Sequence, residues 1–195
     1  MVSVILHECA HGWVAYMRGD PTAKLEGRLT LNPIKHIDPF GTIILPALLI
    51  TLRILGYSTV VLGWAKPVPV NFARLYRPKT DMIWVALAGP VTNILLAVLL
   101  SLFLRPELPL NVVSLLAFAI FINLLLAIFN LMPIPPLDGS RILMGLLPTP
   151  LALAYSRLER YGILIVFLLL SLGIFDRFVV PVVDFCGRWL GVEFP

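Results

Sequence analysis

Two histidines four residues apart, His7 and His11, open the chain, and Glu8 follows the first of them. Residues four apart on a helix lie on one face, one turn from each other. Both imidazoles can therefore reach one metal ion while the carboxylate stands beside it. The residues around them, from Val2 to Met17, are almost all apolar. This stretch predicts a helix at the start of the fold that carries a candidate metal site in apolar surroundings.

The pattern is the H-E-x-x-H arrangement of zinc peptidases. Two neutral imidazoles hold the zinc ion, and the carboxylate activates a water bound to it. A pattern with three defined positions also arises by chance, so two ordinary core histidines are the alternative. A third ligand elsewhere in the chain would favour the metal site.

The composition indicates a membrane protein with several spans. Hydrophobic residues make up 59% of the 195 positions and charged residues 13%, whereas a water-soluble domain carries about a quarter charged residues. The formal net charge of +4 is explained by basic cytoplasmic loops, and we expect no nucleic-acid partner. The only cysteines, Cys9 and Cys186, indicate neither a disulfide framework nor a cysteine zinc site.

We expect an all-α polytopic membrane protein with about four spanning helices. The apolar runs are Val2 to Met17, Asp81 to Leu104, Leu110 to Met132, and Tyr161 to Phe175 with an extension to Val183. Two short runs, Gly27–Asn32 and Gly63–Asn71, have β-strand character. The second can form only an edge strand or an extended loop, because its two prolines lack a backbone N–H.

The apolar segment from Pro39 to Leu55 decides the topology. If it crosses the membrane, Lys and Arg residues divide between the two sides, against the positive-inside bias. If it enters the membrane and returns, the loop cations other than Arg105 lie together on the cytoplasmic side. We favour the re-entrant segment, which makes the two β-like runs membrane-associated neighbours at the cytoplasmic side.

Asp138 is the candidate third ligand. It follows Asn130-Leu-Met-Pro-Ile-Pro-Pro-Leu137 and precedes Gly139, so a turn or a helix N-cap is the alternative. The re-entrant topology brings Asp138 and the two histidines to the same side of the membrane. A carboxylate beside a span is costly unless it is paired or binds metal. We therefore expect His7, His11 and Asp138 to hold one Zn²⁺ per chain.

These motifs together resemble the site-2 proteases, the intramembrane zinc metalloproteases of peptidase family M50, in their compact form without PDZ or CBS domains. The resemblance runs from His7 to Arg141 and does not cover the last quarter of the chain. The matching segments are His7–Gly12, Gly19–Ala23, Gly27–Pro33, His36–Gly41, Gly63–Asn71, Ala88–Asn93, and Asn130 eight residues before Asp138-Gly139.

The resemblance implies a single membrane-embedded protease domain over residues 1–195, with a catalytic core over 1–145 and a C-terminal helical segment over 151–195. Glu8 would take a proton from the zinc-bound water and pass it to the leaving amine. The substrates would be transmembrane proteins in a lipid bilayer, expected to be the bacterial plasma membrane, with the site toward the cytoplasm. Control would come from partner proteins or substrate shape, and the sequence predicts no oligomeric state.

Several polar and apolar residues are candidates for substrate contact or for packing. By resemblance, Asn130 would position substrate or stabilise the oxyanion, and an interhelical hydrogen bond is the alternative. For Asn123 the interhelical bond is the expected role, and for Asn93 close helix packing. Val68 and Val70 lie in the predicted edge strand, which could receive an unwound substrate by strand addition.

Two other classes of function compete with the enzyme. One is a non-catalytic membrane protein of the same fold that binds client helices or metal, and the other is a packing protein with a chance motif. A pure binder needs no carboxylate at Glu8, and the chain shows none of the internal repeats of a transporter. A chance motif does not explain Asp138 together with Asn130.

Overall fold

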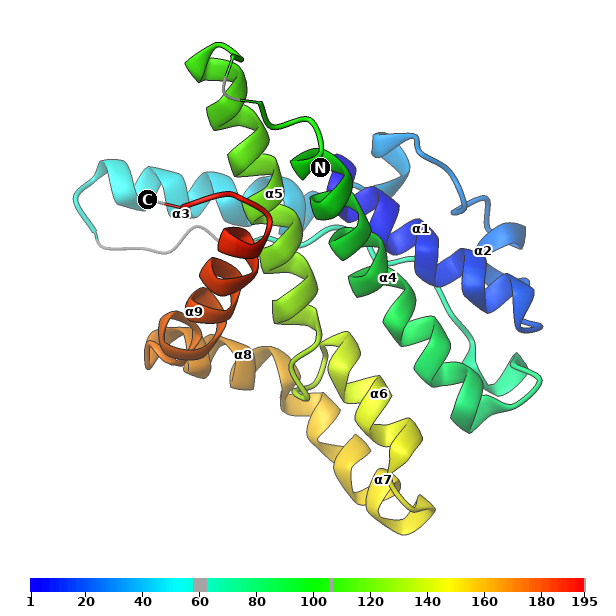
Figure 1. Ribbon diagram of the computed structural model, residues 1–195. Helices are drawn as coiled ribbons and strands as arrows, with labels where there is room; N and C mark the ends of the chain where they lie inside the picture. The colour runs from blue at the N-terminus through cyan, green and yellow to red at the C-terminus, as the bar shows by residue number, and fades with distance from the viewer. Residues whose placement is uncertain (58–62, 106, 195) are drawn as a thin grey trace.

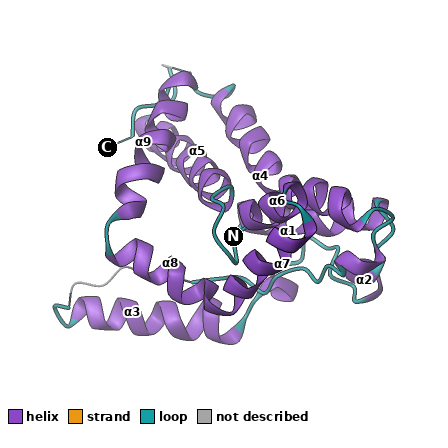
Figure 2. Cartoon of the chain, turned by 90° about the horizontal axis from the view of Figure 1, so that it is seen from below, coloured by secondary structure: helices purple, strands orange, loops and turns teal. Residues whose placement is uncertain are grey.

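The computed structural model describes residues 1–57, 63–105 and 107–194, and helices dominate it (Figures 1 and 2). The α-helices are α1 (Val2–Met17), α2 (Thr22–Leu25), α3 (Leu45–Ile54), α4 (Pro78–Ser101), α5 (Leu110–Asn130), α6 (Asp138–Leu146), α7 (Thr149–Ser156), α8 (Gly162–Ser171) and α9 (Ile174–Trp189). Shorter helical turns are η1 (Pro33–His36), η2 (Pro39–Ile44), η3 (Phe72–Arg74) and η4 (Arg157–Tyr161).

Helix α4 is the centre of the arrangement, because α1, α5 and α6 all pack against it (Figure 1). Its packed face carries small residues, and Ala86, Gly89, Asn93 and Ala97 are all buried. Small side chains let helix backbones approach closely, which is the main source of helix association in a bilayer. The close helix packing predicted for Asn93 is therefore confirmed.

Within the described ranges, two helices are long and apolar enough to cross a membrane, α4 with 24 residues and α5 with 21. A third span would need the pair Thr149–Ser171 and Ile174–Trp189, which is bent by 79°. The break lies at Gly173, which has φ +68°. Exposed leucines on the two long helices, such as Leu95 and Leu115 at 56% and 67% exposure, suit contact with lipid.

The prediction of about four spans is therefore wrong for the described part of the chain. Helix α1 has 16 residues, so it rises about 24 Å, less than the roughly 30 Å of a hydrocarbon core. The apolar run that begins at Tyr161 is interrupted by the bend at Gly173. Apolar composition alone did not reveal either limit.

The predicted β-strands are also wrong, since none of residues 1–57, 63–105 and 107–194 lies in a strand (Figure 2). The backbone of Gly63–Asn71 bonds to side chains and to single carbonyls of the segment around η2, and not to a neighbouring strand. Val68 N–H donates to Glu8 Oε2 at 2.8 Å, and Asn71 N–H donates to Asp20 Oδ2 at 2.6 Å. Prolines at positions 67 and 69 remove two further donors, so no regular ladder can form.

The segment from Pro39 to Ile54 forms one helical stretch, η2 followed by α3, which is apolar but shorter than a span. By Trp64 the chain is again beside the start of this segment, near Gly41 and His36. Trp64 N–H donates to Gly41 O at 3.1 Å, and Lys66 N–H donates to His36 O at 2.9 Å. Both ends of this excursion therefore meet beside α1.

Two apolar clusters hold the helices together. In the larger cluster, Val179 and Val183 of α9 pack with Ile120 and Leu124 of α5 and with Ala97 of α4. The smaller cluster joins α1 to α4 through the side chains of Ala15, Leu75 and Val85. The smaller cluster lies between the two helices that carry most of the candidate site.

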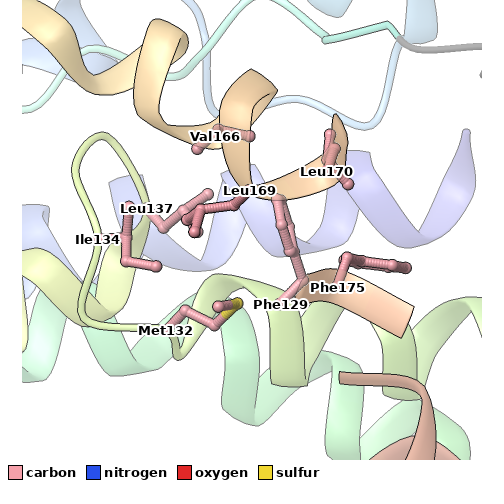
Figure 3. A pocket seen from close by; sticks show the side chains of 8 residues that line it. All are labelled: Phe129, Met132, Ile134, Leu137, Val166, Leu169, Leu170 and Phe175. Carbon is pink, nitrogen blue, oxygen red and sulfur yellow. The ribbon is translucent and has the colours of Figure 1, made fainter. Parts of the chain in front are cut away.

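A small apolar cavity lies where the end of α5, the loop before α6, and α8 with the start of α9 come together (Figure 3). Its walls are the side chains of Phe129, Met132, Ile134, Leu137, Val166, Leu169, Leu170 and Phe175. None of these side chains carries a charge or a strong metal ligand. The cavity is therefore a packing feature next to Asp138 and not a second reactive site.

Candidate active site

Helix α1 directs both histidines of its motif toward the helices that pack on it. His7 and His11 are 5% and 8% exposed, and their Nε2 atoms lie 3.0 Å apart. Gly89 of α4 makes this approach possible, because a Cβ atom at that position would lie 2.5 Å from His7 Nε2. The one-turn spacing of the sequence has thus produced a facing pair of imidazoles.

Asp138 joins the pair from the first turn of α6. Its Oδ2 atom lies 3.1 Å from His7 Nε2 and 3.3 Å from His11 Nε2. The next residue, Gly139, lets this turn sit against the backbone carbonyls of Leu131 and Met132, which a side chain there would strike. The tertiary fold therefore brings together the three residues that the sequence analysis selected as ligands.

The other nitrogen of each imidazole is held by an oxygen acceptor. His11 Nδ1 donates to the carbonyl of Val85 at 2.7 Å. His7 Nδ1 lies 2.5 Å from Asn93 Oδ1, and the Asn93 amide nitrogen donates to Asn123 Oδ1 at 2.9 Å. Protons on both Nδ1 atoms leave a lone pair on each Nε2.

Three acceptors therefore face one point, two imidazole lone pairs and a carboxylate oxygen. Asp138 Oδ2 is buried and has no hydrogen-bond partner among the described residues. Such a cluster is repulsive unless a cation lies within it. Zinc ligands at 2.0–2.1 Å in a tetrahedron stand about 3.3 Å apart, close to the distances between these three atoms. The residues fit a zinc ion.

Glu8 is half-buried beside the three-atom cluster, and its Oε2 accepts the N–H of Val68. The Val68 side chain packs over Gly12, one turn further along α1. Val70 packs on the smaller apolar cluster. The N–H of Val68 is thus already in use, and contacts of Val68 and Val70 with substrate stay a prediction.

The three asparagines have different partners. Asn130 donates to Leu126 O of its own helix at 2.9 Å, so its substrate role stays a prediction. The interhelical bond expected for Asn123 is confirmed by its contact with Asn93. Sequence reasoning missed that Asn93 also holds His7. The signal available was a buried-face amide within an apolar span, where a polar group needs a partner.

Cys9 and His36 lie outside the cluster of possible ligands. Burial raises the pKa of the Cys9 thiol, and its S–H donates to Thr30 O at 3.2 Å. His36 is fully buried, and its Nε2 lies 2.8 Å from the same carbonyl. Both side chains therefore anchor the loop after α2.

Comparison with known proteins supports one family. The model of peptidase family M50 matches residues 105–173, which include Asp138. A protein of Bacillus subtilis, "Putative zinc metalloprotease YwhC", is 43% identical over 181 residues, which cover 87% of this chain and 76% of that protein. The chain belongs to peptidase family M50, the site-2 protease family.

A second relative agrees with this membership. "Putative zinc metalloprotease Rip2" of Mycolicibacterium smegmatis is 34% identical over 194 residues, which cover 96% of this chain and 72% of that protein. No solved structure matches the chain. The M50 chain is accordingly an integral membrane zinc metalloprotease with Zn²⁺ as its cofactor. The resemblance, the enzyme class and the cofactor expected from the sequence are confirmed.

Proposed function

We propose that this M50 protease hydrolyses peptide bonds in or beside the transmembrane segments of membrane proteins. The observation that carries the proposal is the meeting of His7, His11 and Asp138 against α4, a helix long and apolar enough to span a bilayer. A peptidase built on such a helix meets substrates that share its membrane. Membership in the family and the lipid-suited surface of α4 and α5 support the same substrate class.

In this proposal His7, His11 and Asp138 hold the zinc ion, and Glu8 is the general base. Bound zinc supplies Lewis-acid polarisation of the scissile carbonyl and makes a water molecule acidic enough to attack at neutral pH. Glu8 accepts the proton of that water and delivers it to the leaving amine. Asn93 and Val85 keep the two imidazoles in the tautomer that binds metal, through their contacts with Nδ1.

We further propose that the site opens toward the cytoplasm. Asp138 lies toward one end of the group of packed helices. The same end holds the start of α4 and the last turns of α1 and α5. Arg18, Lys79 and Arg141 belong to this end, whereas Arg105 follows the opposite end of α4. An excess of Lys and Arg marks the cytoplasmic side of a membrane protein. The bacterial relatives favour the plasma membrane.

The test uses purified protein in vesicles together with single-span membrane proteins that carry a different tag at each end. The unmodified protease should bind about one zinc per chain and separate the two tags of at least one reporter. Glu8→Gln should keep the zinc and lose cleavage, since it lacks only the base. Asp138→Ala should lose both zinc and cleavage.

Two outcomes would contradict this proposal. If Glu8→Gln cleaves as fast as the unmodified protease, Glu8 is not the base. If the zinc-loaded protease cuts casein, a soluble and unfolded probe, but none of a broad panel of single-span reporters, the substrates do not lie in the membrane. Arg105→Gln, far from the zinc ligands at the other end of α4, serves as the matched control for both measurements.

A further inference from the structure

Residues 64 to 71, which we call the strap, pass over α1. Several of their backbone N–H groups donate hydrogen bonds to neighbouring segments. Trp64 and Lys66 bond to the base of the η2–α3 excursion through Gly41 and His36. Asn71 N–H donates to the fully buried Asp20. Between these anchors lies the Pro67-Val68-Pro69 sequence, whose middle residue donates to Glu8.

Arg28 binds the strap at the Pro67–Val68 peptide, on the side opposite to Glu8. Its Nη2 donates to Lys66 O at 2.9 Å and to Pro67 O at 3.2 Å. The carbonyl of Pro67 and the N–H of Val68 belong to one planar peptide unit and point in opposite directions. A guanidinium therefore sits at the oxygen end of this unit, and the Glu8 carboxylate sits at its hydrogen end.

The charges suit the dipole of that peptide group. A cation at a carbonyl oxygen polarises the peptide and strengthens its N–H as a donor to an anion. Arg28 is only 6% exposed, and burial of a guanidinium is costly unless its contacts compensate. Its location is thus better explained by its hold on two successive carbonyls than by surface solvation.

We propose that Arg28 is a positioning residue for Glu8 and acts through the Pro67–Val68 peptide. This inference rests on the proposed function of Glu8 as the base. Arg28 sets the direction of the Pro67 carbonyl, the planar peptide transmits that direction to the Val68 N–H, and the N–H sets where the carboxylate stands. Flanking prolines at 67 and 69 restrict the backbone torsions and limit other ways to turn the peptide.

The geometry can be measured without any substrate. In the full sequence, four valines directly follow a proline: Val68, Val70, Val91 and Val182. Labelling the detergent-solubilised protein with carbonyl-¹³C proline and ¹⁵N valine therefore selects these four valine amides in its NMR spectrum. Val68→Ile assigns the Val68 signal by its loss.

We expect Arg28→Gln to move the Val68 amide proton upfield, because a weaker hydrogen bond shields it. Glu8→Ala should move it in the same direction, and Arg28→Gln added to Glu8→Ala should add little. Arg28→Lys should restore part of the shift, since it keeps one charged donor. Lys35→Gln, which removes an exposed cation from the neighbouring turn, should leave the signal in place.

The kinetic arm uses a reporter that the unmodified protease cleaves. Arg28→Gln should lower kcat about tenfold or more, with KM changed less than about twofold and zinc content unchanged. An unmoved Val68 signal in Arg28→Gln, or equal loss of zinc and kcat, would overturn the inference. If Glu8→Gln still cleaves, the base assignment fails instead, and the amide signals alone then report whether Arg28 orients the peptide.

Discussion

Nδ1 of His7 lies 2.5 Å from Oδ1 of Asn93, although the two residues are 86 positions apart in the chain. The orientation of the Asn93 amide follows from a second asparagine. Asn123 donates to the backbone carbonyl of Ala119 at 2.8 Å, so its own oxygen must face the Asn93 amide nitrogen. A main-chain carbonyl of α5 thereby determines which nitrogen of His7 carries the proton.

We expect Asn93→Ala to weaken zinc binding about 10-fold to 100-fold, the usual effect of removing a partner that orients a ligand. Asn93→Asp should retain most of the affinity, because it keeps an acceptor at His7 Nδ1. Competition with a fluorescent zinc chelator in detergent measures both. Thr92→Ala is the control, since the Thr92 hydroxyl donates to Ala88 O within its own helix. Unchanged affinity in Asn93→Ala would show that His7 needs no partner.

Gly89 should tolerate no side chain. A Cβ atom there would overlap both imidazole rings, and α4 can retreat only by breaking its packing with α1. We expect Gly89→Ala to reduce zinc content per chain more than about tenfold, as a displaced ligand would. Elemental analysis of the purified protein measures this. Val91→Ala on the exposed side of α4 should keep its zinc, and a fully loaded Gly89→Ala would contradict the close approach.

Removal of zinc should lower the thermal stability of the protein. Three acceptors then face each other without a cation, and the stabilisation from binding is lost. At free zinc one hundred times its Kd, that stabilisation is about 2.7 kcal/mol. Melting curves with a chelator and with added zinc should differ for the unmodified protease and for Glu8→Gln. The same curves should coincide for Asp138→Ala, and a zinc-dependent shift there would contradict the ligand assignment.

In α9, we expect the buried Val183 to contribute more to stability than its exposed neighbour Val182. Val183 is 0% exposed within the larger cluster, whereas Val182 is 45% exposed. Val183→Ala should cost about 1–2 kcal/mol in the free energy of unfolding, because it leaves an unfilled space between α9 and α5. Val182→Ala should cost much less. Unfolding by titration with sodium dodecyl sulfate compares the two, and equal effects would contradict the placement of α9.

The strands were predicted where none exists because local composition does not reveal where backbone groups bond. Gly63–Asn71 has the residues of an extended edge strand, and its last residue, Asn71, has an extended backbone. The partners of residues 66 to 71 include the side chains of Glu8, Arg28 and Asp20, which come from other parts of the sequence. A side-chain carboxylate can satisfy an N–H as well as a strand can, and only the fold decides which is near.

Local chemistry was sufficient for the spacing of His7, Glu8 and His11 and for the two long apolar helices, because helix periodicity and span length act over neighbouring residues. It also indicated Asp138, through the cost of a carboxylate beside a span. Tertiary structure alone decided that Asn93 holds His7, that Arg28 and Glu8 share one peptide group, and that the last apolar run bends at Gly173. These relationships join positions far apart in sequence, and their energies depend on which helices pack together.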